Sequence, residues 1–250
     1  MTNLRQLTPR LYYLRLSVGQ AYLWIDDDVT LIDTGGPGCL PEIRAAFSRL
    51  ELGADDLRRI VLTHGHGSNA GATAEVARWA NDVEVHAHPE DAAVIRGELP
   101  PPQPRIEGPG TWLSAELIAA LARFPAAPVH IEVKNRDVID FGGGAVIRHT
   151  PGHTAGSISI HLPEHQVVFT GGAAIRTARD ITFGQANDDN DNALFSFARI
   201  ALLQPDIACF GFGPPIVGNA ADKLLDAFDA LDANHGHLIG PGPEARHCAW

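Results

Sequence analysis

Two histidines separated by a single residue, His64 and His66, are the side chains of this sequence that most clearly indicate chemistry. They follow the apolar run Ile60 to Leu62 and lie in the segment Thr63 to Gly71, which reads Thr-His-Gly-His-Gly-Ser-Asn-Ala-Gly. Side chains two residues apart on a strand point to the same face, and a glycine-containing turn lets two imidazoles converge. Imidazole nitrogens are common ligands of zinc and other transition metals. The pair therefore predicts half of a metal site at the end of a strand.

This segment resembles the Thr-His-x-His-x-Asp-His signature of the metallo-β-lactamase superfamily, whose members include glyoxalase II-like hydrolases. The family's Pro-Gly-His-Thr motif has a full match in Pro151 to Thr154, followed by Ala-Gly-Ser. Leu31 to Gly35 resembles the family's early strand and turn, and Ala87 to Pro89 resembles its middle segment. The resemblance covers roughly residues 10 to 230 and implies the α/β family fold, a four-layer αββα sandwich in one domain over residues 1–250.

The resemblance also implies a dinuclear metal site of which this chain retains only half. The three histidines of the family's first metal site are present, as His64, His66 and His153. The ligands of the second metal are replaced by Ser68, Asn69 and Phe212, and the bridging Asp by Gly172. The sequence therefore predicts a degenerate site that holds at most one metal ion.

Three neutral imidazoles with an open fourth position describe a catalytic zinc site, in which one ion lowers the pKa of water to about 7. Iron and manganese also accept imidazole, so the donor set does not fix the ion. We expect Ser68, Asn69, Gly172 and Phe212 to line a substrate pocket in which the vacated second-metal volume has become apolar. Asp33 matches a family residue that supports the ligand loops from behind. His88 matches a position close to the site, and the alternative is a structural, hydrogen-bonded imidazole.

Three functions are consistent with this pattern. The first is a hydrolase that acts on a thioester, a lactone or another activated carbonyl of a small organic substrate, with His64, His66 and His153 as metal ligands and catalytic residues. The second is a metal-free lyase, isomerase or cyclase of specialised metabolism, in which the same histidines act as general acids and bases. The third is a catalytically silent binding protein. Phosphodiester substrates are disfavoured, because they profit from two metal ions.

Several other polar segments have both a functional and a structural interpretation. Ser68 is a candidate nucleophile, although its position favours the N-cap of a helix from Asn69 to Ala80. The acidic run Asn187 to Asp191 has oxygen ligands for a cation, but it is more typical of a solvated turn that caps the next helix. His235 and His237 repeat the spacing of the first motif after a helix and before a Gly- and Pro-rich segment, which favours exposed side chains; one of them is a candidate late ligand if this segment lies over the pocket.

Composition excludes several classes of protein. The chain has 250 residues, of which 45% are hydrophobic, enough for a large buried core. A formal net charge of −11 disfavours binding to nucleic acid, so we expect a small-molecule substrate as the partner. The sequence contains no long apolar stretch and Met1 to Arg10 has no signal core, so we expect no membrane association and a cytoplasmic location. The 3 widely spaced cysteines are consistent with reduced thiols.

Apolar periodicity predicts the elements that position these residues. Alternating and continuous apolar runs predict strands at Leu11–Leu16, Ala21–Ile25, Val29–Ile32, Val83–Ala87, His130–Lys134, Ala145–His149, Ser157–Leu162, Val167–Thr170 and Ile207–Phe210. Helical periodicity predicts helices at Pro41–Leu50, Asn69–Ala80, Pro89–Arg96, Leu113–Phe124, Asn190–Gln204 and Ala220–Asn234. Leu99 to Gly110 is rich in proline and predicts a loop. Hairpin strands mixed with strand–helix units favour mixed sheets covered by helices.

Overall fold

A computed structural model describes residues 3–100, 124–178, 180–184 and 186–234 of the chain. Within them, the first sheet has the strand order β1-β2-β3-β4-β5-β6-β7. The strands of this sheet are β1 (Asn3–Gln6), β2 (Leu11–Arg15), β3 (Gln20–Ile25), β4 (Val29–Ile32), β5 (Leu57–Val61), β6 (Glu84–Ala87) and β7 (Ile131–Glu132). The pairs from β1 to β4 are antiparallel and those from β4 to β7 are parallel.

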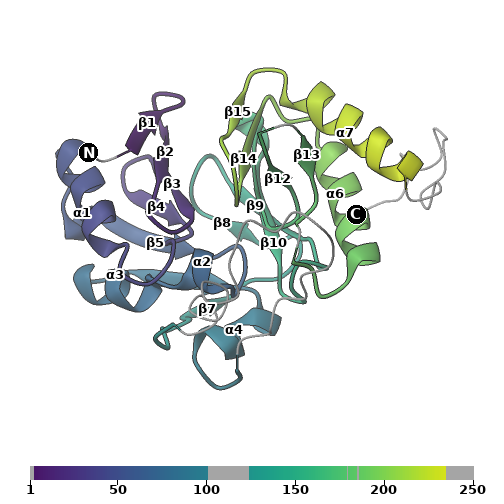
Figure 1. Ribbon diagram of the computed structural model, residues 1–250. Helices are drawn as coiled ribbons and strands as arrows, with labels where there is room; N and C mark the ends of the chain where they lie inside the picture. Colours follow the sequence, from purple (N-terminus) through teal and green to yellow (C-terminus); the bar gives the residue numbers. More distant parts are fainter. Residues whose placement is uncertain (1–2, 101–123, 179, 185, 235–250) are drawn as a thin grey trace.

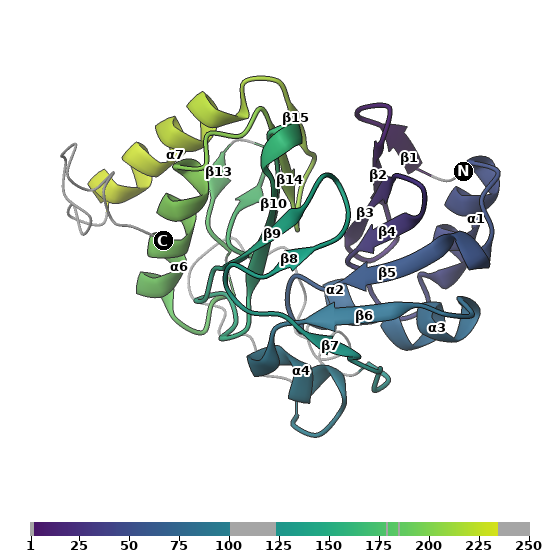
Figure 2. The same cartoon turned by 180° about the vertical axis from the view of Figure 1, so that it is seen from behind.

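The second sheet has the order β15-β14-β11-β10-β9-β8 and stands beside the first (Figure 2). Its strands are β8 (Val138–Ile139), β9 (Ala145–His149), β10 (Ile158–Leu162), β11 (Val167–Gly171), β14 (Ile207–Phe210) and β15 (Ile216–Val217). A separate ribbon pairs β12 (Ile175–Arg176) with β13 (Ile181–Thr182). The pair β11 and β14 is parallel, and helix α6 (Asn190–Ala201) lies in the connection between β13 and β14, as in a strand–helix–strand unit.

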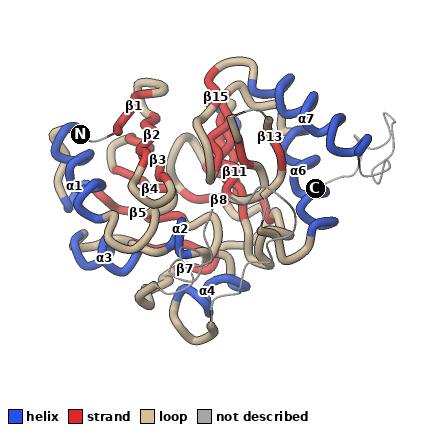
Figure 3. Tube along the Cα trace, in the orientation of Figure 1, coloured by secondary structure: helices blue, strands red, loops and turns tan. Residues whose placement is uncertain are grey.

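Helices cover the outer faces of the two sheets (Figures 1 and 3). The helices are α1 (Leu40–Arg49), α2 (Gly67–Ala70), α3 (Thr73–Trp79), α4 (Pro89–Ile95), α6 (Asn190–Ala201) and α7 (Ala220–Asn234), with short 3-10 turns at Ala54–Asp56 and Pro163–His165. In Figure 1, α1 and α3 flank the first sheet on the left, and α6 and α7 flank the second sheet on the right. This arrangement confirms the predicted four-layer αββα sandwich.

Three layers of buried apolar side chains lie between these four layers of backbone. Neighbouring residues of one strand point into different layers: Leu31 packs toward the helices α1 and α3, whereas Ile32 packs between the sheets. In the second sheet, Phe169 contributes to the layer between the sheets and Val168 to the layer under α6 and α7. Strands buried on both faces explain why their sequences are continuous apolar runs.

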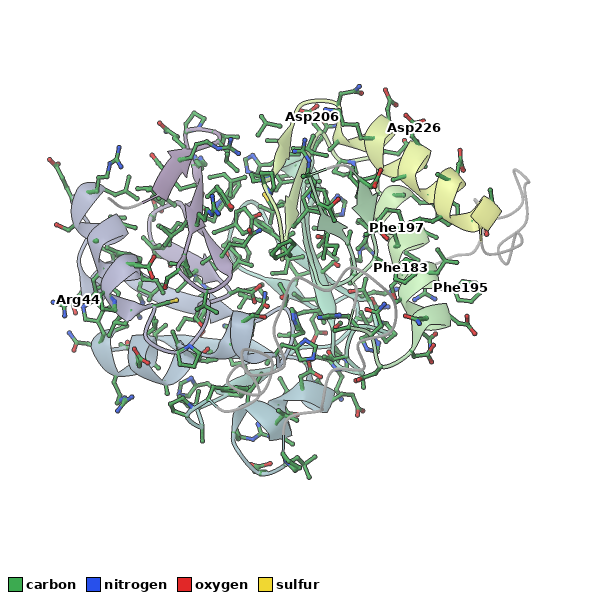
Figure 4. All side chains as sticks on the ribbon, viewed as in Figure 1. Arg44, Phe183, Phe195, Phe197, Asp206 and Asp226 are labelled. Atoms are coloured by element: carbon green, nitrogen blue, oxygen red, sulfur yellow. The ribbon has the colours of Figure 1, made fainter. Side chains whose placement is uncertain are left out.

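Helix α6 likewise buries one face and exposes the other. Phe197 is fully buried against the second sheet, whereas Phe195, two residues earlier, is 43% exposed and projects away from it (Figure 4). Helical periodicity places residues two positions apart on different faces of the helix. No helix in the part of the chain that the structure describes has both the length and the apolar character needed to cross a bilayer.

Most predicted elements are confirmed with shifts of one to three residues at their ends. One helix is wrong: the continuous helix Asn69–Ala80 is divided into α2 and α3, and Ser68 lies inside α2 rather than at its N-cap. Hydrogen bonds to the segment at Thr34 and Gly35 interrupt the helix. The Thr34 N–H donates to the Asn69 carbonyl at 2.7 Å, and the Ala72 N–H donates to the Gly35 carbonyl at 3.2 Å. The helix predicted at Leu113–Phe124, most of the proline-rich loop, and His235 and His237 lie outside the described residues.

Candidate metal centre

The two histidine motifs meet where the two sheets adjoin. His64 and His66 follow strand β5 of the first sheet, and His153 lies in the turn that precedes β10 of the second sheet. The Ile158 N–H donates to the Thr63 carbonyl at 2.8 Å and joins the two segments directly. One ligand nitrogen from each of His64, His66 and His153 lies within 4.8 Å of the others, and we call these residues the histidine triad. Their ring centroids are 4.6 to 5.0 Å apart.

Hydrogen bonds to neighbouring groups fix which ring nitrogens face the centre of the triad. The Thr63 hydroxyl donates to Asp33 Oδ2 at 2.8 Å and therefore accepts from His64 Nδ1 at 3.0 Å. This assignment leaves His64 Nε2 without a proton and available as a ligand. His66 Nδ1 lies 2.9 Å from His153 Nε2, and His66 Nε2 is buried without a hydrogen-bond partner within the described structure.

Burial keeps the histidine triad neutral. It lowers the pKa of His64 and His66 well below the usual histidine range, with the neighbouring triad rings as further causes. Burial also lowers the pKa of His153 to about 4. Neutral imidazole is the form that coordinates a metal, and at neutral pH it has no proton to spare for general acid catalysis. The donor set therefore fits a transition metal ion.

Asp33 supports Thr63 to Gly71, which we call the first histidine segment, through hydrogen bonds. It is 3% exposed, and its carboxylate accepts from the Thr63 N–H and from Asn69 Nδ2, both at 2.8 Å. Burial raises the pKa of Asp33 to about 6, although its hydrogen bonds act in the opposite direction. Its φ of 59° is in the left-handed region, which is uncommon for a residue other than glycine and recurs at functional sites. Asp33 thus occupies the supporting place expected from the resemblance.

Asp91 is a second buried carboxylate that the sequence did not single out. Its Oδ2 accepts from the Gly65 N–H and from the Thr154 hydroxyl, both at 2.7 Å, and its Oδ1 accepts from the Gly156 N–H at 2.9 Å. Gly65 belongs to the first histidine segment, whereas Thr154 and Gly156 belong to the second, which is Pro151 to Ser157. Asp91 therefore joins the two segments to each other and to α4. In the sequence it reads as one more acidic residue in the first turn of a helix, a common position for a solvated side chain.

The residues expected to line an apolar substrate pocket have more specific contacts. Asn69 is 4% exposed, and its side chain donates to Asp33. Ser68 donates from its hydroxyl to Asn69 Oδ1 at 2.8 Å. Phe212 is half-buried in the turn between β14 and β15, and its carbonyl accepts from the Arg176 N–H at 2.9 Å. Asn69 therefore holds the ligand loop in place.

The surroundings of Gly172 bear on the expectation that the vacated second-metal volume has become apolar. A Cβ atom at Gly172 would lie 2.0 Å from Cδ2 and 2.8 Å from Nε2 of His153. The ring of His153 therefore occupies the space directly over Gly172, where the side chain of an Asp would have to begin. Contact distances this short are not tolerated between non-bonded atoms, because ordinary carbon contacts are about 3.5 to 4.0 Å.

The contacts of His88 are those expected of a structural, hydrogen-bonded imidazole. It is 7% exposed and caps α4, where its Nδ1 accepts from the Glu90 N–H at 3.4 Å. Its ring stacks on that of His149 with 4.2 Å between the centroids. His149 Nε2 in turn lies 2.8 Å from the Ala155 carbonyl, next to the second histidine segment. His88 is therefore connected to the triad indirectly: it caps α4, and Asp91 of α4 contacts both histidine segments.

The αββα architecture, with a histidine triad where its two sheets adjoin, defines the class of protein to which this chain belongs. The family model of the metallo-beta-lactamase superfamily matches residues 15–211, and the chain belongs to this family. The probable metallo-hydrolase YflN of Bacillus subtilis (strain 168) is 27% identical over 200 residues, which cover 71% of this chain and 72% of that protein. The human acyl-coenzyme A thioesterase MBLAC2 is 31% identical over 176 residues, or 62% of this chain and 58% of that protein.

The fold is also found in solved structures. The metallo-beta-lactamase family protein TTHA1429 from Thermus thermophilus superposes with a TM-score of 0.70 at 19% identity. The match covers 94% of this chain and 83% of that one. At this identity the similarity supports the fold, and function has to be argued from the site.

Proposed function

We propose that this protein is a hydrolase that cleaves an activated carbonyl of a small organic substrate, with a thioester as the first candidate and a lactone as the second. Its histidine triad would hold a single metal ion, for which zinc is the first choice. The observation that carries the proposal is the convergence of three neutral imidazoles, while the positions of a second metal site are occupied by other contacts. Membership of the superfamily and the names of the two relatives, a probable metallo-hydrolase and an acyl-coenzyme A thioesterase, support the reaction class.

The residues present fit one metal ion. Three imidazoles with an open fourth position are a common catalytic zinc donor set. One ligand nitrogen of each ring lies within 4.8 Å of the others, and burial lowers the pKa of all three rings, so they are in the neutral form that binds a metal. When bound, such an ion supplies a nucleophile from water near neutral pH and polarises the carbonyl oxygen of the substrate.

The same geometry argues against a second metal ion. Asn69 already donates to Asp33, and an amide is a poor replacement for an imidazole ligand. Gly172 provides no carboxylate, and the His153 ring fills the space above it. Phe212 offers no donor atom in its side chain. One ion is therefore the largest number that the described residues support.

Asp33 and Asp91 contribute by keeping the histidine-bearing segments in one arrangement. Each carboxylate accepts hydrogen bonds from more than one residue of those segments, at distances of 2.7 to 3.1 Å. Partners of this kind, behind the ligands, commonly change metal affinity or activity by about 10- to 100-fold when they are removed. The site is therefore preorganised to accept the ion without rearrangement of the backbone.

The test uses the full chain without a histidine tag, purified without added metal and then loaded with Zn²⁺. Acyl-coenzyme A thioesters, lactones and a phosphodiester are supplied as substrates. We expect metal-dependent hydrolysis of a thioester or lactone, its loss in His64→Ala and His153→Ala, and no hydrolysis of the phosphodiester. His165→Ala is the matched control, because His165 is exposed and packs on Trp24 rather than on the triad.

The outcomes separate the three candidate functions. Turnover that survives complete removal of metal would contradict the proposal and favour a metal-free enzyme. Stoichiometric metal binding without turnover of any activated carbonyl would favour a binding protein. Equal loss of activity in His165→Ala and His153→Ala would show that the assay reports folding rather than the triad.

A further inference from the structure

Asn187 contacts the histidine triad from a segment that the sequence describes only as an acidic turn. It lies between β13 and α6 and is 6% exposed, whereas its neighbours Asp188 and Asp189 are exposed. Its Oδ1 lies 3.1 Å from His153 Nδ1. The expectation of a solvated turn therefore holds for the two aspartates and is wrong for Asn187.

The orientation of the Asn187 amide is fixed by its other contacts. Its Nδ2 donates to the Gly184 carbonyl at 2.5 Å and to Asn190 Oδ1 at 2.9 Å. A carbonyl oxygen only accepts hydrogen bonds, so the NH₂ group has to face Gly184 and the amide oxygen has to face His153. His153 Nδ1 must then carry the proton of the neutral ring, which leaves its Nε2 with a lone pair.

Two glycines close the space around the same ring. A Cβ at Gly184 would lie 2.7 Å from His153 Nδ1, and a Cβ at Gly172 would lie 2.0 Å from its Cδ2. The ring is therefore held between backbone surfaces and directed along one axis, from Asn187 at Nδ1 to His66 at Nε2. The distance from His153 Nε2 to His66 Nδ1 is 2.9 Å.

The backbone of Asn187 is anchored to the same turn as His153. The Asp189 N–H donates to the Gly152 carbonyl at 3.0 Å, and the Asp188 N–H points to the His153 carbonyl at 3.4 Å. Asp189 also caps α6, accepting from the Asn192 N–H at 3.0 Å. The start of α6 thus sets the position of Asn187 relative to His153.

We propose that Asn187 is a positioning residue that fixes the tautomer and orientation of His153, so that Nε2 rather than Nδ1 faces His64 and His66. This proposal rests on the proposed function and extends it, because Asn187 would keep a lone pair on Nε2 of His153, the third ligand, available for a metal ion. Asn187 contacts the triad at His153 Nδ1 and acts through that ring. Partners that hold the second nitrogen of a ligand imidazole fix its tautomer in this way.

The first measurement is the tautomer of His153 in the metal-free protein, read from ¹⁵N chemical shifts of the ring and assigned with His153→Gln. We expect the wild-type ring to be protonated at Nδ1 and to become a mixture of tautomers in Asn187→Ala. Asn187→Asp retains an acceptor and should retain the wild-type tautomer. Asn192→Ala is the matched control, because Asn192 contacts Asp189 and lies in the same segment.

The second measurement is the affinity for Zn²⁺, determined by competition with a chelator. Asn187→Ala should weaken it by about 10- to 100-fold, whereas Asn192→Ala should leave it unchanged. A wild-type His153 protonated at Nε2 would overturn the proposal even if Asn187→Ala did not fold. An Asn187→Ala protein that lost stability but kept the tautomer and the affinity would also overturn it, since Asn187 would then be merely structural. If the wild-type chain bound no metal, the proposed function would fail, and the tautomer alone would decide the role of Asn187.

Discussion

Substitution of Gly172 by Ala tests the placement of His153 with a single methyl group. The new Cβ would lie 2.0 Å from Cδ2, 2.5 Å from Cγ and 2.8 Å from Nε2 of the ring. Carbon atoms in ordinary contact are about 3.5 Å apart or more, so the ring has to move by about 1.5 Å. Gly172 does not have a positive φ, so the substitution adds no backbone strain of its own.

The magnitude follows from what the movement breaks. A shift of this size misaligns the His153 contacts with Asn187 and His66, now 3.1 and 2.9 Å, and weakens both hydrogen bonds. Two hydrogen bonds at about 0.5 to 1.5 kcal/mol each and overpacking at about 1 to 3 kcal/mol give a loss of about 2 to 6 kcal/mol. For a chain of this size each kcal/mol lowers the melting temperature by about 2 to 4 °C.

The assays are thermal unfolding of the metal-free protein and chelator competition for Zn²⁺. We expect Gly172→Ala to lower the melting temperature by about 4 to 24 °C and to weaken metal binding by at least about tenfold. Gly53→Ala is the control, because a Cβ at Gly53 would meet only Asp56 Oδ2, at 3.8 Å, and φ is −115° there. A Gly172→Ala protein with wild-type stability and affinity would refute the placement of the His153 ring over Gly172.

Three further predictions concern the metal, the supporting carboxylate and the stacked histidine. Elemental analysis should find at most one transition metal ion per chain and none in His153→Ala; two equivalents would require ligands outside the triad. Asp91→Ala should lower the free energy of unfolding in urea by at least about 3 kcal/mol, because it leaves three buried donors unsatisfied, each at about 1 to 3 kcal/mol. Glu90→Ala, on an exposed position of the same helix, should change it by less than about 0.5 kcal/mol, and a similar loss in both variants would contradict the role of Asp91. Burial and the neighbouring His149 lower the pKa of His88 to about 4, so the folded state holds fewer protons than the unfolded state. The stabilising contribution of neutral His88 is therefore complete above about pH 6.5 and lost as the pH falls toward 4, and His88→Asn, which keeps a cap acceptor, should reduce this loss by up to about 3 kcal/mol. Identical pH dependences of unfolding in the two proteins would show that His88 is not buried as a neutral ring.

The sequence predicted the fold well because both faces of its strands and one face of its helices are buried. Continuous apolar runs such as Val167 to Thr170 can be recognised without knowledge of their partners. The break between α2 and α3 could not be predicted, because it depends on a hydrogen bond donated by Thr34 and one accepted by Gly35, both far away in the sequence. The two-residue strands β8, β12, β13 and β15 are too short to show any periodicity.

The three histidines of the triad could be found from the sequence because they lie in local motifs of fixed spacing. Asp91 and Asn187 could not, because acidic and amide residues near helix starts are ordinarily solvated caps. What distinguishes these two is burial and the identity of their partners, both of which depend on how the two sheets meet. For Gly172, the sequence showed correctly that a carboxylate is missing, but the position of the His153 ring follows only from the structure.

The contacts of Asn69, Gly172 and Asn187 bear on how a one-metal site differs from a two-metal site. Restoring Asp at position 172 would place a Cβ inside the present ring of His153, and restoring His at position 69 would remove the amide that donates to Asp33. Addition of the missing ligands therefore also disturbs the surviving ones. A buried carboxylate such as Asp33 is costly unless its oxygens accept hydrogen bonds, so the loss of the Asn69 amide would be felt at Thr63 and through it at His64. Asn69 and Gly172 thus belong to the support of the triad, which is a physical reason to propose a site adapted to one ion rather than a damaged site for two.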